Sequence, residues 1–143
     1  MNFQKICVLG LGYIGLPTAS TFATHGLTVL GVDTNPHVVE TLQNGNIHIH
    51  EPGLQTVVDS ALQSGNLTVS AQPQEADAFL IAVPTPFYEE SHGEYDGRKY
   101  RLADMRAVTA ATEAILPCLR PGNLVVLEST SPPRGPKPGD ATS

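Results

Sequence analysis

The sequence predicts an α/β domain in which helices cover a mostly parallel sheet in the doubly wound arrangement. Short apolar runs at residues 6–9 and 78–83 have no polar interruption, which is typical of strands buried on both faces. Longer segments with helix signals alternate with these runs. The 143 residues, 41% hydrophobic and 15% charged, suffice for one globular domain and do not fit a disordered chain.

The expected elements alternate along the chain. Strands are expected at residues 6–9, 27–32, 67–69, 78–83 and 123–128, and helices at residues 13–24, 36–43, 53–63 and 102–119. Gly26 is expected to stop the first helix, and Asn35 and Pro36 suit the N-cap and first position of the second. Asp104 near the start of the last helix favours its dipole. The polar segment 87–101 is expected to be a loop.

The turn after the first expected strand carries the pattern Gly-x-Gly-x-x-Gly, at Gly10, Gly12 and Gly15. Gly10 permits a tight turn out of the strand, Gly12 lets the backbone approach a pyrophosphate, and Gly15 lets the helix pack close to the sheet. The pyrophosphate would lie over the amides of the helix that begins near Tyr13. Glycines alone are weak evidence, but their place between a strand and a helix predicts a Rossmann-type dinucleotide site.

Asp33 identifies the dinucleotide. It follows Gly15 by eighteen residues and ends the second expected strand, where a carboxylate can accept hydrogen bonds from both ribose hydroxyls. The same carboxylate would repel a 2′-phosphate, and the four residues after it include no arginine. The sequence therefore predicts NAD as the cofactor in preference to NADP.

Charge and composition exclude several other classes of function. The net charge of −6 leaves no basic stripe for a nucleic acid. The apolar run near the N-terminus is too short for a signal peptide or a membrane span, so no membrane association is expected. Cys7 and Cys118 have no metal-binding or disulfide spacing, which fits a reducing compartment. We therefore expect a cytoplasmic protein.

Five blocks of sequence resemble the UDP-glucose/GDP-mannose dehydrogenase family and occur in the family's order. They read VLGLGYIGLP at residues 8–17, GVDTN at 31–35, EPGL at 51–54, AVPTP at 82–86 and ESTSP at 128–132. Within the family, residues 47–52, 75–87 and 127–132 look most similar to the branch that acts on UDP-N-acetyl-D-mannosamine. The resemblance covers residues 5 to about 133.

The resemblance implies oxidation of the C6 alcohol of a UDP-sugar to a carboxylate, with two NAD consumed per sugar. A cysteine outside these residues would hold the intermediate covalently as a thiohemiacetal. Tyr13 and Ile14 would contact the cofactor through the glycine turn. Thr85 would lie under the nicotinamide half, and Thr130 would bridge the cofactor and the substrate or a catalytic water, as an auxiliary catalytic residue.

The sequence departs from the family in one respect that affects its function. The family's catalytic cysteine, lysine and asparagine lie beyond residue 143, and neither Cys7 nor Cys118 matches the nucleophile. We expect residues 1–133 to form the NAD-binding domain and residues 134–143 to be a disordered tail that is not family-like. This chain alone is then expected to be inactive. A catalytically incomplete NAD-binding module, UDP-glucose or GDP-mannose as substrate, and a homodimer of the full-length form remain open.

Two further features have a functional and a structural interpretation. His48, His50 and Glu51 form a His-x-His-Glu cluster in which the two histidines could share one face and bind a metal. No third or fourth ligand is evident nearby, so we expect no metal and interpret the segment as a loop near the cofactor. Glu51 could also shape the substrate cleft. The charged segment 88–101 is expected to be a solvated, mobile loop, with a lid over the sugar nucleotide as the alternative.

Overall fold

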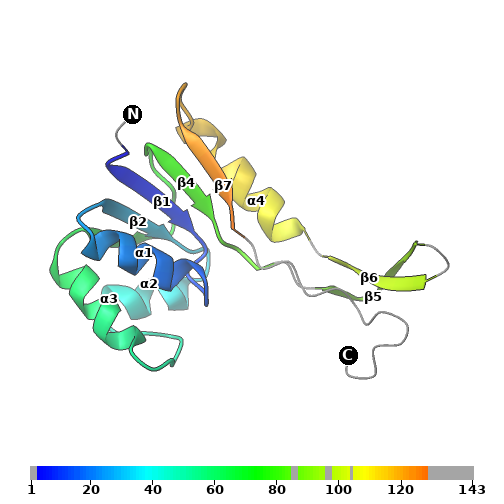
Figure 1. The fold of residues 1–143 in the computed structure, drawn as a ribbon, viewed down its shortest axis with the longest axis horizontal. Coiled ribbons are helices and arrows are strands. Elements are labelled where there is room, and N and C mark those ends of the chain that lie inside the picture. The colour runs from blue at the N-terminus through cyan, green and yellow to red at the C-terminus, as the bar shows by residue number, and fades with distance from the viewer. Residues whose placement is uncertain (1–2, 85–86, 96–97, 104, 129–143) are drawn as a thin grey trace.

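The computed structural model describes residues 3–84, 87–95, 98–103 and 105–128. Its main sheet consists of parallel strands in the order β3-β2-β1-β4-β7 (Figure 1). The strands are β1 (Lys5–Leu9), β2 (Thr28–Val32), β3 (Leu67–Ser70), β4 (Ala78–Ile81) and β7 (Leu124–Leu127). The chain moves outward from β1 to β3 and then returns to β4, so the order reverses between β1 and β4. This confirms the predicted doubly wound parallel sheet and places its switch point at the end of β1.

The central strands are buried on both faces because apolar residues occupy successive positions. In β1, Ile6 and Val8 belong to one hydrophobic cluster, whereas Cys7 and Leu9 belong to the other. Side chains alternate between the faces of a strand, so an uninterrupted apolar run supplies both clusters. The edge strand β7 differs, because all four of its apolar residues are 40–52% exposed.

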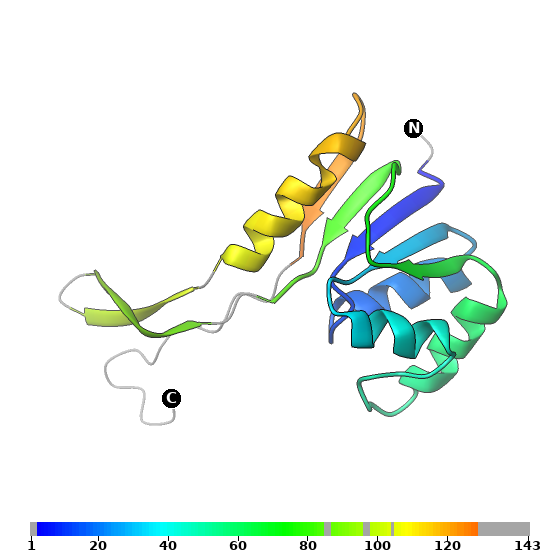
Figure 2. The same ribbon diagram turned by 180° about the vertical axis from the view of Figure 1, so that it is seen from behind.

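Helices cover the two faces unequally. Residues of α1 (Gly15–Thr24), α2 (Pro36–Gln43) and α3 (Leu54–Gln63) join the cluster that contains Val8. Those of α4 (Arg106–Ile115) join the cluster that contains Cys7. Figures 1 and 2 show these two groups of helices on opposite sides of the sheet. No described helix has the length and apolar character needed to cross a bilayer.

The helix bounds agree with the sequence where a strong local signal exists. The helix α2 covers the predicted residues, and the Asn35 side chain caps it by accepting a 3.0 Å hydrogen bond from the His37 N–H. The prediction for α1 was two residues too early, because the residues after Gly10 continue the turn before the helix begins. Strand β4 ends two residues earlier than predicted, although Ala82 N–H still donates to Leu9 O at 2.7 Å.

The prediction of a helix over residues 102–119 was wrong at both ends. Leu102 and Ala103 belong to a strand, the helix α4 starts at Arg106, and it gives way to a 3₁₀ helix, η1 (Leu116–Cys118). Pro117 explains the change at the C-terminal end, since proline has no N–H for the helical ladder and its ring opposes a continued α-helix. Asp104 lies outside the described residues.

The loop expected at residues 87–101 is instead an antiparallel hairpin of β5 (Phe87–Tyr95) and β6 (Arg98–Ala103). It projects away from the main sheet in both ribbon views (Figures 1 and 2). The prediction of a loop was wrong because it relied on the polar composition and gave no weight to a stronger hairpin signal. Asp96 and Gly97 stand between the two strands in the sequence, and an Asp-Gly pair is among the best short-range indicators of a hairpin.

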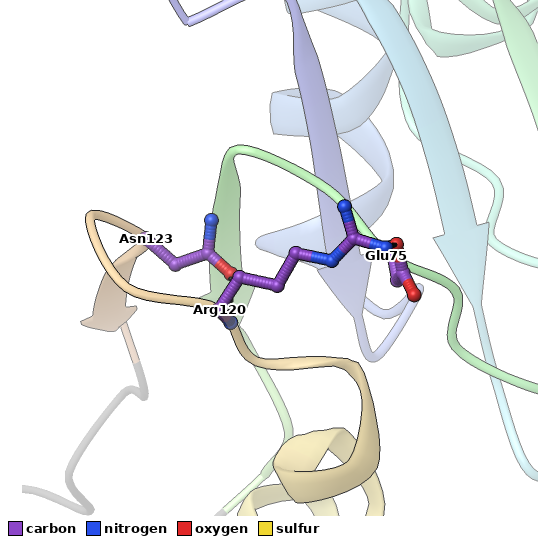
Figure 3. Close-up of polar contacts among 3 residues, drawn as sticks. All are labelled: Glu75, Arg120 and Asn123. Carbon is purple, nitrogen blue, oxygen red and sulfur yellow. Dashed lines mark hydrogen bonds and ion pairs between the residues drawn. The ribbon is translucent and has the colours of Figure 1, made fainter.

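Polar contacts join the amino-terminal ends of three strands of the main sheet. The Asp77 carboxylate accepts hydrogen bonds of 2.9 Å from the backbone N–H groups of Gln4 and Lys5, and the Asp77 carbonyl accepts one of 3.1 Å from Leu124 N–H. Nearby, the Arg120 side chain pairs with Glu75, and Arg120 N–H donates to the Asn123 side chain at 2.8 Å (Figure 3). These contacts tie the starts of β1, β4 and β7 together.

Replacement of Asp77 by alanine is expected to lower the melting temperature at neutral pH. The two N–H donors hold the pKa of the Asp77 carboxyl below its usual range. Because the pKa is lower in the folded state, the ionised Asp77 carboxylate stabilises the native state at pH values above its pKa in the unfolded chain, roughly 3.9. This stabilisation is lost as the pH falls through the folded-state pKa. Thermal unfolding of wild type and Asp77→Ala at pH 7 and at pH 3 measures the difference, which should shrink at the lower pH. Glu40→Ala, which removes an exposed carboxylate, is the control; an equal loss in both variants would refute the role of Asp77.

Candidate functional site

The site predicted from the glycine pattern lies at the carboxyl ends of β1 and β2, beside the end of β4. Gly10 leaves β1 with φ of +96°, a conformation that residues with a Cβ rarely adopt. Gly10 N–H donates to Val32 O at 2.8 Å, and a Cβ on Gly10 would lie 2.7 Å from Ala82 O. The turn therefore lies between the ends of β2 and β4, the two strands on either side of β1, and only glycine fits at its first position.

Gly15 and Gly12 differ in what surrounds them. A Cβ on Gly15 would lie 1.7 Å from Gly10 O, so the first turn of α1 packs directly on the backbone of the glycine turn. A Cβ on Gly12 would meet nothing within 4 Å. Protein packing therefore explains the glycine at position 15 but leaves open space beside position 12. That space fits the predicted approach of a pyrophosphate to the backbone.

The start of α1 provides free backbone donors for an anion. Its first i→i−4 hydrogen bond runs from Leu16 N–H to Gly12 O at 3.1 Å, so the amides of residues 12–15 precede the helical ladder. The N-cap residue Ile14 supplies no side-chain cap, and the first turn contains no acidic residue. No acidic side chain of the helix's own first turn neutralises its positive end, which suits phosphate binding.

Asp33 is already anchored without a ligand. One carboxylate oxygen accepts a 3.0 Å hydrogen bond from Leu11 N–H, and the other accepts one of 2.9 Å from Asn35 N–H. Each carboxylate oxygen can accept a second hydrogen bond, so acceptor capacity remains for ribose hydroxyls. Asp33 therefore holds the glycine turn as well as offering a ribose contact. Only the ribose contact was predicted from the sequence, although an Asx turn from Asp33 to Asn35 could have been expected.

Leu11 is the residue through which the turn is held. Its side chain is fully buried, and a Cβ on Gly31 of β2 would lie 3.0 Å from it. Its N–H donates to Asp33, and its carbonyl accepts a 2.6 Å hydrogen bond from the His48 ring nitrogen Nε2. Leu11 was missed as a site residue because the pattern Gly-x-Gly treats the position between the first two glycines as unrestricted. Gly31 and His48 were given no contact with the turn, although the segment of His48 was expected near the cofactor.

The three potential metal ligands of the segment after α2 do not come together as a metal site. His48 turns toward the glycine turn, whereas His50 and Glu51 are exposed. In the part of the chain that the structure describes, no group of three His, Cys, Asp or Glu residues could hold a metal ion. The segment instead approaches the predicted cofactor site through His48.

The remaining predicted residues are placed as follows. Tyr13 is 68% exposed beside the turn, and Ile14 is partly buried at the N-cap of α1. Thr85 and Thr130 lie outside the described residues, so their roles stay predictions. Burial raises the pKa of the Cys7 thiol to about 11, which keeps it protonated at neutral pH.

The comparison with protein families decides between a generic Rossmann domain and a particular one. Residues 4–138 match the model of the "UDP-glucose/GDP-mannose dehydrogenase family, NAD binding domain". The chain belongs to this family. The matched region is its NAD-binding domain, NAD is its cofactor, and the resemblance seen in the sequence blocks is confirmed.

Individual relatives of this dehydrogenase-family chain point to one branch. UDP-N-acetyl-D-mannosamine dehydrogenase of Methanococcus maripaludis strain C7 is 49% identical over 136 residues, covering 95% of this chain and 30% of the relative. The enzyme of that name from Yersinia pestis is 52% identical over 132 residues, covering 92% of this chain and 29% of the relative. The solved UDP-N-acetyl-mannosamine dehydrogenase of Staphylococcus aureus superposes with a TM-score of 0.80 at 49% identity, over 88% of this chain and 29% of that chain. The family domain thus spans about 30% of the length of the curated relatives.

Proposed function

We propose that this domain provides the NAD site of a nucleotide-sugar 6-dehydrogenase, which oxidises the C6 alcohol of UDP-N-acetyl-D-mannosamine to the carboxylate with two NAD. The observation that carries the proposal is the anchored Asp33 beside the open space at Gly12, in a chain about 50% identical to enzymes of that name. UDP-glucose or GDP-mannose is the alternative substrate, as the family description includes both.

Each predicted residue has a part in holding NAD, which accepts hydride when it is bound. Gly10 and Gly15 shape the turn, and the amides at Gly12, Tyr13 and Ile14 face the pyrophosphate as donors. Asp33 accepts hydrogen bonds from the ribose. We extend the site to Thr85 on the nicotinamide side, and to Thr130 between cofactor and substrate, from their positions after the last two strands of the main sheet and from the family resemblance.

We further propose that these 143 residues bind NAD without oxidising a sugar. The proposed mechanism needs a thiolate that attacks the aldehyde formed in the first oxidation. Cys7 is buried inside β1 with a raised pKa, and Cys118 lies in η1 next to the Cys7 cluster and away from the glycine turn. The UDP-sugar would therefore be bound and oxidised with the help of residues that these positions do not supply.

The setting of the reaction follows from the same chemistry. We propose that the uronate made from the UDP-sugar serves polysaccharide biosynthesis and that the reaction takes place in the cytoplasm. The two free cysteines are consistent with a reducing compartment. We place the full-length enzyme there as a homodimer.

Calorimetric titration of this chain with NAD and NADP tests the cofactor part of the proposal. NAD is expected to bind at least roughly 10-fold more tightly, because a 2′-phosphate would replace a hydroxyl donor and meet the Asp33 carboxylate. Equal affinities would overturn the role of Asp33. Incubation with NAD and UDP-N-acetyl-D-mannosamine should produce no NADH absorbance at 340 nm, and sustained NADH production would refute the proposed lack of turnover.

A chimera tests the enzymatic part. Residues 1–133 of this chain would replace the matching domain of the Yersinia relative, which is 52% identical. The chimera is expected to oxidise UDP-N-acetyl-D-mannosamine, because this domain would supply the NAD site and the relative would supply the remaining residues that bind and oxidise the sugar. A chimera that binds NAD but does not oxidise this sugar would contradict the proposal.

A further inference from the structure

Within the described part of the chain, the polar contact of His48 is to the glycine turn. Its Nε2 lies 2.6 Å from the carbonyl oxygen of Leu11, 37 residues earlier in the chain. A carbonyl oxygen only accepts hydrogen bonds, so Nε2 must carry the proton and donate it. The other ring nitrogen, Nδ1, is buried and has no hydrogen-bond partner among the residues that the structure describes. Packing alone does not require a histidine here, because a buried, unpaired nitrogen costs stability that a purely apolar ring would not.

The Leu11 carbonyl belongs to the same planar peptide group as the N–H of Gly12. In a trans peptide the C=O and N–H bonds point in opposite directions, so fixing one fixes the other. Gly12 has no Cβ, and an added one would meet nothing within 4 Å, so no side-chain packing at this position fixes the orientation of the peptide group. The hydrogen bond from His48 is a contact that does hold it.

Asp33 orients the preceding peptide group in the same way. Its carboxylate binds the N–H of Leu11, which belongs to the peptide group between Gly10 and Leu11. Two side chains from separate segments therefore orient two successive peptide groups, one through its N–H and the next through its C=O. A donor on a carbonyl also polarises the peptide group, which strengthens its N–H as a donor to an anion.

We propose that His48 is a positioning residue for the cofactor: it fixes the peptide group between Leu11 and Gly12 and thereby presents the first amide of the pyrophosphate-binding turn. This inference rests on the proposed site at the glycine turn. It adds a polar side chain from outside the Gly-x-Gly-x-x-Gly pattern to the residues that determine NAD affinity.

Two substitutions of His48 and a control substitution of His50 distinguish a positioning role of His48 from a role in packing alone. His48→Phe keeps a ring of similar size without a donor, and we expect it to weaken NAD binding about 10-fold, the effect of one hydrogen bond. His48→Gln places an amide nitrogen near the position of Nε2 and should restore binding to within about 3-fold of wild type. His50→Phe, at an exposed position two residues on, should leave NAD affinity unchanged.

The readouts are NAD affinity by calorimetry, thermal unfolding, and the Gly12 amide resonance in ¹⁵N-labelled protein without ligand. Loss of the bond to Leu11 should move the Gly12 resonance in His48→Phe and leave it near the wild-type position in His48→Gln. If His48→Phe fails to fold, His48→Asn serves as the second variant, since the asparagine side chain is too short for its amide nitrogen to reach Leu11 O. Wild-type affinity in a folded variant that lacks the donor would overturn the inference. Absence of NAD binding by the wild type would instead refute the proposed function.

Discussion

Substitution of Gly15 by alanine is expected to lower the melting temperature by roughly 10 °C, because an overpacked backbone contact of this kind costs about 3 kcal/mol or more. The added Cβ would lie 1.7 Å from Gly10 O and 3.3 Å from the Ala82 side chain. The carbonyl that it meets cannot rotate away, since Gly10 is itself held between the ends of β2 and β4. The helix α1 would have to move away from the sheet, and NAD binding should be lost with it.

Gly12→Ala is the matched control for this effect. The same methyl group at Gly12 meets no atom within 4 Å, so the melting temperature should stay within about 3 °C of wild type. NAD affinity should nevertheless fall, because the methyl group would occupy the space left for the pyrophosphate. Thermal unfolding followed by circular dichroism, with calorimetry on the folded variants, measures both effects. Equal melting temperatures for the two variants would contradict the tight packing of α1 on the turn.

Substitution of Asp33 by alanine is expected to raise the dissociation constant for NAD roughly 100-fold, the effect of losing hydrogen bonds to a charged acceptor. Two losses combine in this variant. The ribose hydroxyls lose their acceptor, and the N–H groups of Leu11 and Asn35 lose the carboxylate that orients them. NADP binding should weaken far less, because the charge that opposes its 2′-phosphate is removed at the same time.

Calorimetric titration of Asp33→Ala with both dinucleotides measures the ratio of their affinities, which should approach one. Glu40→Ala removes one negative charge from an exposed position of α2 and should keep the wild-type ratio. Asp33→Asn retains the shape of the side chain but directs an amide N–H₂ toward one of the two backbone donors, so it should lie between wild type and Asp33→Ala. A proportional loss of NAD and NADP binding would mean that Asp33 only supports the turn.

The part of the fold that was predictable from the sequence is the part whose signals are local. The run around Cys7 alternates between two faces that are both buried, so its apolar residues identify a parallel strand without further information. Asn35 and Pro36 define the start of α2 because capping involves only neighbouring residues. The hairpin of β5 and β6 was missed because its composition is polar, although the Asp-Gly pair in the sequence between the two strands is a hairpin signal.

The candidate site divides in the same way. Gly10 and Gly15 were predicted because each meets a backbone requirement that only glycine satisfies. Asp33 was predicted because a carboxylate at the end of the second strand can accept hydrogen bonds from the ribose hydroxyls. The segment of His48 was expected to lie near the cofactor, but no contact was assigned to His48 itself, since its hydrogen bond with Leu11 depends on how the segment after α2 folds back over the turn. No spacing rule relates two residues that are 37 positions apart, so this contact is visible only in three dimensions.

The backbone of Leu11 is hydrogen-bonded to Asp33 and His48, which lie 22 and 37 residues later in the chain. This separation affects the order in which the contacts of the domain form during folding. A partly folded molecule with β1, α1 and β2 in place would have native secondary structure while the glycine turn still lacked its contact with His48. Contacts of long sequence separation carry a loop-closure cost and form only when the intervening chain is ordered. A ligand that binds only the native state shifts the folding equilibrium toward it. NAD present during refolding would therefore favour the molecules in which all three segments have already met, and its uptake reports completion of the domain more strictly than helix content does.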